Sequence, residues 1–394
     1  MSTLRPEQYG ASGDGRADDT RAVVAALAAL APGDTLRLSG TYRHTTPLRI
    51  TKNGVRVTGG GELVGTDSRA CALVVAAHGV IVEDLSLTVV TTVRQTSNES
   101  AALLVGSGGP VRGFRARRLH LDGSGLMLRG QSSDFRLEDV LVTNSMGDGI
   151  HLTDGVHDGI VSRPTVLHSG DDGVAVVSYL SDVAPCRDVE IRSPRVRDVY
   201  HGRGVSVVGG SRIRIFDLDV SQTSGAAVYI ACEDNSDWRT YAPQDVVVRG
   251  GLVTAANTTA PAPDHGAVLV VNESSNRRIE SVAVSGLVIR DTLASYRVIG
   301  FLGGPGGGFT GCRLSDVVVS GSSPRLVTDI GGGTVEVSGL RVGVTQFVPH
   351  PAEVWLTNPN GRLSGAHGST AALLDGSYWY KLTTGDTSGW QRLA

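Results

Sequence analysis

The sequence has few aromatic residues, almost no methionine and no long apolar run. Of its 394 residues, 5% are aromatic and three are methionine. No segment reaches the about 18 consecutive apolar residues of a membrane-spanning helix. The first ten residues also lack the apolar stretch of a secretion signal. We therefore expect no membrane insertion, and we expect the chain to be made in the cytoplasm.

An excess of charge of one sign is also lacking. Lysine and arginine total 36, aspartate and glutamate total 39, and the formal net charge is −3. A nucleic-acid-binding protein usually carries a strongly basic face or stripe. The near balance of charges excludes an obvious nucleic-acid partner, and a hydrophobic content of 40% excludes wholesale disorder.

Cysteine is sparse and widely spaced, and no two cysteines form a CxxC pair. The four are Cys71, Cys186, Cys232 and Cys312. Structural metal sites and disulfide frameworks show closely spaced cysteines. We expect four free, packed thiols, and the sequence predicts neither a metal ion nor another cofactor.

Glycine, in contrast, is abundant: 52 residues, or about 13% of the chain against roughly 7% in an average protein. Short runs rich in valine and isoleucine, which favour strands, alternate with residues that end strands. Such runs are Val55–Thr58, Val80–Leu87, Val246–Arg249, Val282–Ile289 and Val317–Ser320. One helix is expected, over Asp18–Leu30, because an Asp-Asp-Thr cap precedes an alanine- and leucine-rich face.

The runs recur at a nearly fixed period. A glycine followed by alternating apolar residues stands at Gly125, Gly149, Gly173, Gly204, Gly225 and Gly266. The first three are 24 residues apart, and the later intervals are 31, 21 and 41 residues. A repeating coil of about 21–24 residues is typical of a parallel β-helix, although a β-sandwich also has strands every about 8–12 residues. The longer intervals predict a loop around Ser178–Cys186, and either an excursion over Cys232–Pro243 or an additional coil.

The residue before each of these glycines would lie in one column, about 4.8 Å from its neighbour in the next coil. The column reads Ser124, Asp148, Asp172, Arg203, Ser224 and His265. Asp148 and Asp172 repel when both are ionised, so one should have a raised pKa. Asp171 adds a third carboxyl group. A lone aspartate before glycine is an ordinary turn residue, but one protonated and one ionised carboxyl group are what acid–base hydrolysis of a glycosidic bond requires. The candidate catalytic residues are therefore Asp148, Asp171 and Asp172.

Five further residues near the column are candidates for substrate binding: His151, His201, Arg203, Tyr229 and Glu233. Alternation along the strand would turn Ile150 and Leu152 inward and His151 outward. Arg203 could neutralise the carboxylates, and His201 could act in acid–base chemistry or serve as a turn residue. Tyr229 and Glu233 would end the following rung on the same side.

The segment from Tyr9 to Val23, YGASGDGRADDTRAV, resembles the N-terminal signature of the pectate-lyase-like, right-handed parallel β-helix superfamily. That superfamily includes polygalacturonases and phage tailspike depolymerases. The resemblance implies an all-β protein, a single-stranded right-handed parallel β-helix with an N-terminal helical cap. We expect the cap over residues 1–40, the β-helix over residues 41–350 and a small C-terminal β-hairpin module over residues 351–394.

Two motifs in the middle of the chain resemble those of polygalacturonases. MGDGI at residues 146–150 resembles the family's Asn-x-Asp-Gly motif, with methionine in place of asparagine, and SGDDGVA at residues 169–175 resembles its Asp-Asp motif. The resemblance implies that Asp172 is the general acid and that Asp148 and Asp171 position the attacking water. It also implies inversion at the anomeric carbon.

Two other motifs of that family are altered. GRG at residues 202–204 stands where the family has Gly-His-Gly, so Arg203 replaces the histidine. Ala227 and Tyr229 stand where the family's arginine and lysine bind the carboxylate of the sugar acid. These replacements argue against polygalacturonate as the substrate.

The C-terminal end concentrates aromatic residues: Tyr378, Trp379, Tyr380 and Trp390. The segment resembles the endings of phage tail fibres and tailspikes, which implies a homotrimer in a phage or phage-like tail particle that acts at the cell surface. The aromatic side chains would pack on the last coil, form an oligomer contact or bind a glycan.

The sequence favours a polysaccharide-degrading glycoside hydrolase that uses stacked aspartates as general acid and base on a glycan bound along the solenoid. The altered motifs keep a first alternative open, a tail protein that binds a glycan receptor without cutting it. A polysaccharide lyase is the second alternative. A lyase needs positive charge at the uronate, for which the sequence offers mainly Arg203.

Overall fold

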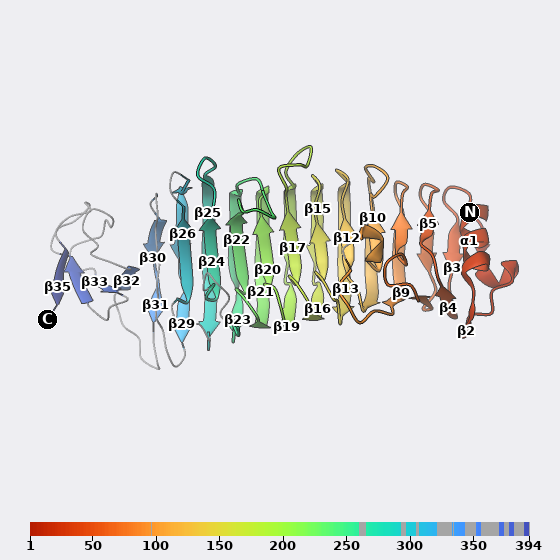
Figure 1. The fold of residues 1–394 in the computed structure, drawn as a ribbon, viewed down its shortest axis with the longest axis horizontal. Coiled ribbons are helices and arrows are strands. Elements are labelled where there is room, and N and C mark those ends of the chain that lie inside the picture. The colour runs from red at the N-terminus through yellow and green to blue at the C-terminus, as the bar shows by residue number, and fades with distance from the viewer. Residues whose placement is uncertain are drawn as a thin grey trace. The chain divides into compact units, whose positions relative to one another are not determined.

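The computed structural model describes residues 1–95, 97–259, 265–292, 297–304, 307–320, 333 and 335–342, and the backbone of four short strands within residues 352–393. The chain divides into two compact units, Met1–Gly202 and Arg203–Ala394. Nearly all of the regular structure is β-strand, and the strand pairs up to residue 342 are parallel (Figure 1).

The first unit, Met1–Gly202, contributes strands to two parallel sheets. The shorter strands follow one another as β5 Leu48–Ile50, β8 Leu73–Val75, β10 Leu103–Val105, β12 Leu126–Leu128, β14 Ile150–Leu152 and β17 Val174–Val177. The other sheet takes β1 Thr3–Leu4, β2 Asp14–Asp18, β3 Thr35–Arg37, β4 Thr41–His44, β6 Arg56–Thr58, β7 Glu62–Gly65, β9 Ile81–Val89, β11 Arg115–Asp122, β13 Ser133–Thr143, β15 His157–Ser162, β16 Thr165–Ser169, β18 Arg187–Arg192 and β19 Arg195–Val199.

The predicted 24-residue period is confirmed in this unit. Leu126 lies opposite Ile150, and Ile150 lies opposite Val174. The loop expected around Ser178–Cys186 joins β17 to β18. Because β18 nevertheless pairs in parallel with β15, the loop lengthens the coil without disturbing the stack.

In the second unit the shorter strands β20 Val205–Val208, β22 Val228–Cys232, β24 Val268–Asn272 and β26 Ile299–Gly303 form a parallel sheet in that order. The other sheet takes β21 Ser211–Thr223, β23 Gln244–Thr254, β25 Ile279–Arg290, β27 Phe309–Thr310, β28 Cys312–Ser315, β29 Val318–Ser320, β30 Val335–Ser338 and β31 Arg341–Val342. A separate four-stranded sheet holds β32 Ala352–Trp355, β33 Thr370–Leu373, β34 Tyr378–Lys381 and β35 Trp390–Leu393.

In this last sheet β33, β34 and β35 pair antiparallel, while β32 pairs in parallel with β33. The backbone of β33, β34 and β35 is thus antiparallel, while the module expected over residues 351–394 stays a prediction. The aromatic contacts predicted for Tyr378, Trp379, Tyr380 and Trp390 lie outside the described side chains.

The predicted register is wrong in the second unit. Val205 pairs with Val228, an interval of 23 residues, so Ala227 rather than Gly225 lies opposite Gly204. Val228 pairs directly with Val268, so one long coil with an excursion accounts for the wide interval and an additional coil does not. Ser224 and His265 consequently lie out of register with Arg203 and do not continue the predicted column.

The interior is lined by the apolar residues of the alternating runs. On β14, Ile150 and Leu152 are fully buried, and His151 between them is partly exposed, as the alternation predicts. Fully burying a side chain of this size stabilises the fold by roughly 1.5–3 kcal/mol. On β13, Phe135 is buried over Gly159, its partner on β15, and a Cβ on Gly159 would come within 2.0 Å of the ring.

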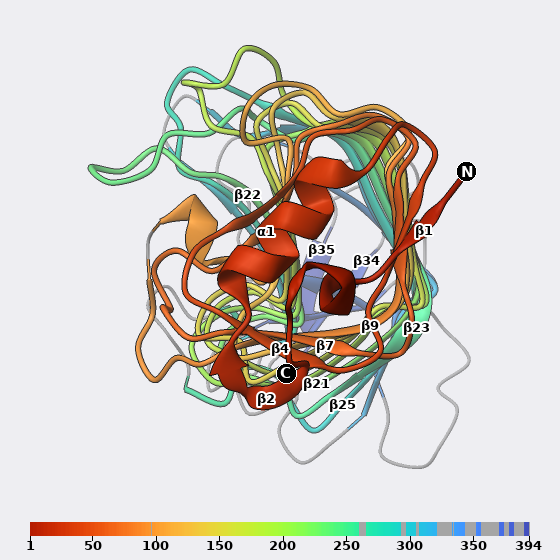
Figure 2. The same cartoon turned by 90° about the vertical axis from the view of Figure 1, so that its right-hand side faces the viewer.

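Helix α1, Thr20–Ala29, confirms the one expected helix and is shorter at both ends. Its buried face consists of Ala22, Val23, Ala26 and Leu27. Asp19 does not cap the helix with its side chain; its carboxylate accepts the backbone N–H groups of Ser12 and Gly13. Figure 2 looks onto this region, where α1 contacts β4, β5 and the short 3-10 helix η1, Pro6–Tyr9. A second 3-10 turn, η2, spans Asn98–Ser100.

All four cysteines are free and buried, as expected. Burial raises the pKa of each thiol, to about 11 for Cys186. No helix among the described residues is both long and apolar enough to cross a membrane.

Candidate active site

Asp148 lies on the turn between β13 and β14. The turn is fixed by hydrogen bonds from the Ser145 hydroxyl to the Asp148 carbonyl, 2.8 Å, and from the Gly149 N–H to the Asp172 carbonyl, 2.9 Å. A Cβ on Gly149 would meet the Gly173 carbonyl and the Val166 side chain within 2.6 Å. Glycine is therefore required beside Asp148, because any other residue would push neighbouring coils apart.

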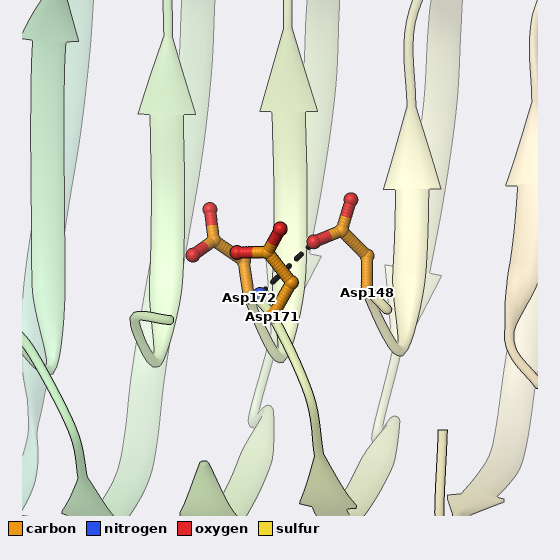
Figure 3. A group of neighbouring side chains, drawn as sticks. All are labelled: Asp148, Asp171 and Asp172. Atoms are coloured by element: carbon orange, nitrogen blue, oxygen red, sulfur yellow. Dashed lines mark hydrogen bonds between the residues drawn. The ribbon is translucent and has the colours of Figure 1, made fainter. Parts of the chain in front are cut away.

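Asp171 and Asp172 occupy the equivalent turn one coil later, between β16 and β17. The Asp171 N–H donates to the Gly147 carbonyl, 3.1 Å, and the Asp172 N–H donates to Asp148 Oδ1, 2.9 Å. The second bond ties one carboxylate to the backbone of the next coil (Figure 3). The predicted stacking of Asp148 and Asp172 in this unit is thus present.

The three carboxyl groups form one cluster. An oxygen from each of Asp148, Asp171 and Asp172 lies within 4.8 Å of the others. Asp172 is the most enclosed, with 4% of the residue exposed, whereas the side chains of Asp148 and Asp171 are 18% and 21% exposed. Such a set could hold a divalent cation, or it could divide protonated and ionised roles for acid–base chemistry.

His151, predicted as a substrate-binding residue, contacts this cluster directly. Its Nδ1 lies 2.5 Å from Asp148 Oδ2. Burial alone would lower the pKa of His151, but the charge of Asp148 and its hydrogen bond with the ring, with smaller contributions from the other two carboxyl groups, outweigh burial and raise the pKa above its ordinary value. A proton on His151 would favour the ionised form of Asp148 and fix its orientation.

Arg94 is a site residue that sequence reasoning missed. It lies after β9, and its guanidinium is 2.5 Å from Asp171 Oδ2. Burial opposes its charge, but Asp171, Asp148 and Asp172 together raise the pKa of Arg94. The sequence has no motif or spacing that links Arg94 to the aspartates. Its place beside them follows only from the fold, which brings a loop of another coil to the carboxyl groups.

His201 lies one coil beyond Asp171. Ser169 pairs with Val199, so Asp171 is opposite His201 and Asp172 is opposite Gly202. Consistently, a Cβ on Gly202 would come within 2.7 Å of the Asp171 and Asp172 backbones. The His201 side chain is exposed on this turn.

Three other predicted residues gather within the second unit. The Arg203 guanidinium carbon lies 4.3 Å from the centre of the Tyr229 ring, and Arg203 also pairs with Glu233 at 3.5 Å. The Tyr229 hydroxyl donates to Glu233, 3.2 Å, and the ring stacks on His265 with centres 5.2 Å apart. Tyr229 is 5% exposed. Burial chiefly raises the pKa of its phenol, with Glu233 adding to the effect and Arg203 opposing it.

The protonated His151 is expected to stabilise the fold in a pH-dependent way. Because its pKa is raised in the folded protein, its contribution is complete below the unfolded pKa of about 6.5 and is lost as pH rises through the folded value. His151→Gln should therefore cost about 1–3 kcal/mol near pH 6 and clearly less at pH 9. Urea unfolding of both proteins at the two pH values measures this. An equal loss at both would contradict the charged pair.

The fold and the cluster together describe a parallel β-helix protein with a carboxylate site on its turns. No protein-family model matches the chain, and no curated protein matches it. Solved structures do resemble it. The catalytic unit of the thermostable GH87 α-1,3-glucanase from Streptomyces thermodiastaticus aligns with a TM-score of 0.63 at 19% identity, over 86% of this chain and 68% of that one.

Two further structures are similar in the same way. The Agl-KA catalytic domain aligns with a TM-score of 0.69 at 15% identity, over 86% of this chain and 65% of that domain. The A-module of the mannuronan C-5 epimerase AlgE6 from Azotobacter vinelandii aligns with a TM-score of 0.62 at 16% identity, over 87% of this chain and all of the module. The chain thus spans about two thirds of the Streptomyces catalytic unit and of the Agl-KA domain. At these low identities, the structural alignments show the parallel β-helix fold alone.

Proposed function

We propose that the protein is a glycoside hydrolase that cleaves an extended polysaccharide at the Asp148–Asp171–Asp172 cluster. The gathering of three carboxyl groups within 4.8 Å on adjacent turns carries this proposal. Structural neighbours support a glycan substrate, since GH87 α-1,3-glucanase catalytic domains have been solved with nigerose and with tetrasaccharides.

The surroundings of the three carboxyl groups suggest how they divide the chemistry. His151 holds Asp148 as a carboxylate and Arg94 holds Asp171 as a carboxylate. Asp172 is the most buried, beside two negative groups, which favours its protonated form. Asp172 would donate its proton to the leaving oxygen, and Asp148 and Asp171 would accept a proton from the attacking water.

Arg94 should set the pH range of activity. Arg94→Gln removes the cation from Asp171, so the pKa of Asp171 rises relative to the wild type. We expect kcat/KM to fall about 10–100-fold, with its acidic limb displaced to higher pH. Arg94→Lys should restore part of the rate and part of the pH shift, because it returns a positive charge without the planar guanidinium. A uniform loss of rate with an unchanged pH profile would contradict this role.

A lyase or epimerase acting on uronic-acid polymers is the second candidate. Two observations favour it: the Arg94 cation beside the carboxylates, and the structural likeness to a mannuronan C-5 epimerase. A cation there could neutralise a uronate while a carboxylate removes the proton next to it.

Product analysis separates the two functions. The full chain would be incubated with α-1,3-glucan, alginate, polygalacturonate and neutral bacterial surface polysaccharides. New reducing ends without ultraviolet absorbance would establish a hydrolase. Absorbance from unsaturated ends would establish a lyase, and a changed uronate composition without new ends would establish an epimerase. If no polymer is cleaved or epimerised, the catalytic proposal is wrong and glycan binding remains as the function.

We further propose that the coils wind right-handed and that α1 closes the first coil. Crossover connections between parallel strands of one sheet are right-handed in about 98% of cases, and solenoids need their terminal coils covered. A homotrimer within a phage-like tail particle remains a proposal from sequence resemblance, and light scattering of the purified chain would measure its mass.

A further inference from the structure

Tyr200 is an exposed aromatic residue on the coil that follows Asp171 and Asp172. Its N–H donates to the Ser169 carbonyl, 3.0 Å, so the residue lies opposite Gly170, directly before Asp171. The residue is 41% exposed. An aromatic ring is therefore presented to solvent about one coil spacing, 4.8 Å, from the turn that carries the two aspartates.

The contacts of the Tyr200 hydroxyl hold the ring in place on this turn. The Tyr200 hydroxyl donates to Met146 Sδ, 3.5 Å. A Cβ on Gly170 would come within 2.5 Å of the hydroxyl oxygen and 2.6 Å of the Met146 carbonyl. The absence of a side chain at Gly170 is thus what lets the phenol cross the turn between Met146 and Asp171.

A second side chain orients the ring. His168, also exposed, packs against Tyr200 with ring centres 4.8 Å apart and planes tilted by 32°. The His168 Nδ1 is held 2.7 Å from Asp198 Oδ2. Tyr200 is consequently anchored at its hydroxyl and along its ring, which lowers the entropy lost when a ligand packs on it.

We propose that Tyr200, positioned by His168, is a stacking platform for a pyranose ring of the glycan, in the subsite beside the scissile bond. This inference rests on the proposed function for the place of the scissile bond. Exposed tyrosine offers a large apolar face with a polar edge, which matches a sugar whose C–H face is apolar and whose hydroxyls point outward. The ligand class is therefore a pyranoside, held by its ring face rather than by a carboxylate.

The test compares Tyr200→Ala with Tyr200→Phe and with Tyr9→Ala. Tyr9 is a matched control, because it is 36% exposed and lies on η1 at the start of the chain. Binding would be measured in the Asp172→Asn background by affinity electrophoresis in gels containing α-1,3-glucan, alginate or polygalacturonate. Tyr200→Ala should weaken binding to the retarding polymer about 3–10-fold. Tyr200→Phe keeps the ring but loses the bond to Met146, so it should weaken binding less than Tyr200→Ala does, and Tyr9→Ala should leave binding nearly unchanged.

Kinetics separate this inference from the proposed function. In otherwise wild-type protein, Tyr200→Ala should raise KM by a similar factor and change kcat by less than about twofold, as expected for a group that binds substrate and transition state alike. Binding that depends on Tyr200 without cleavage of any polymer would overturn the hydrolase and keep the platform. Cleavage with an unchanged KM in Tyr200→Ala, or no retardation in any gel, would overturn the platform.

Discussion

Asp172→Asn is expected to lower kcat by about 10²–10⁴-fold while leaving glycan binding intact. The amide keeps the size of the carboxyl group but cannot deliver a proton to the leaving oxygen. The turn should survive, because the bond that fixes it comes from the Asp172 N–H to Asp148 Oδ1 and does not use the substituted side chain. Reducing-end release under saturating polymer, with affinity electrophoresis alongside, measures both quantities.

The leaving group sharpens this test. The dinitrophenolate of a dinitrophenyl glycoside leaves without being protonated. Asp172→Asn should therefore lose far less activity on this substrate than on the polymer. Asp148→Asn removes one of the two carboxylates proposed to accept the water proton, so it should lose activity on both substrates. Asp158→Asn is a control, since that side chain is 61% exposed and its contact is with the neighbouring His157, away from the three aspartates in sequence. A kcat above one tenth of the wild-type value in Asp172→Asn would contradict its role as the acid.

Phe135→Ala is expected to reduce the free energy of unfolding by about 3–5 kcal/mol. The ring is 1% exposed and covers Gly159 on the neighbouring strand, whose missing side chain makes room for it. Removing the ring leaves a cavity above a glycine, and glycine has no side chain that could relax into the space. Urea denaturation followed by circular dichroism measures the loss.

A paired substitution tests whether the cavity is the cause. Gly159→Val alone should destabilise the protein, because its side chain would collide with the Phe135 ring. Combined with Phe135→Ala, the added side chain should fill part of the cavity, so that the double variant is more stable than the sum of single effects predicts. Strict additivity would show that the two residues do not share one space.

The fold could be predicted where residue chemistry repeats. Glycines before alternating apolar residues gave the period of the first unit correctly, because side chains are excluded where one coil approaches the next. The same glycine pattern predicts the wrong register in the second unit. There Ala227 occupies the position opposite Gly204, and alanine is small enough to stand where the sequence pattern expected glycine.

The candidate site, too, could be predicted from the sequence only in part. Asp148, Asp171 and Asp172 follow the period and meet as expected. His265 was placed in the column by count, yet it packs on Tyr229 instead. Arg94 and Tyr200 carry no sequence signal of their own, since their proximity to the aspartates arises from a loop conformation and from the bare Cα of Gly170.

The long coil of the second unit shows how such a chain can acquire new surface. Val228 pairs with Val268 after 40 residues, whereas Val205 pairs with Val228 after 23, and both pairs keep parallel register. Doubling the length of a closed loop costs only about 0.6 kcal/mol of chain entropy. Insertions between strands are therefore nearly neutral for folding, and loops of very different length can diversify the outer surface while the stacked interior stays unchanged.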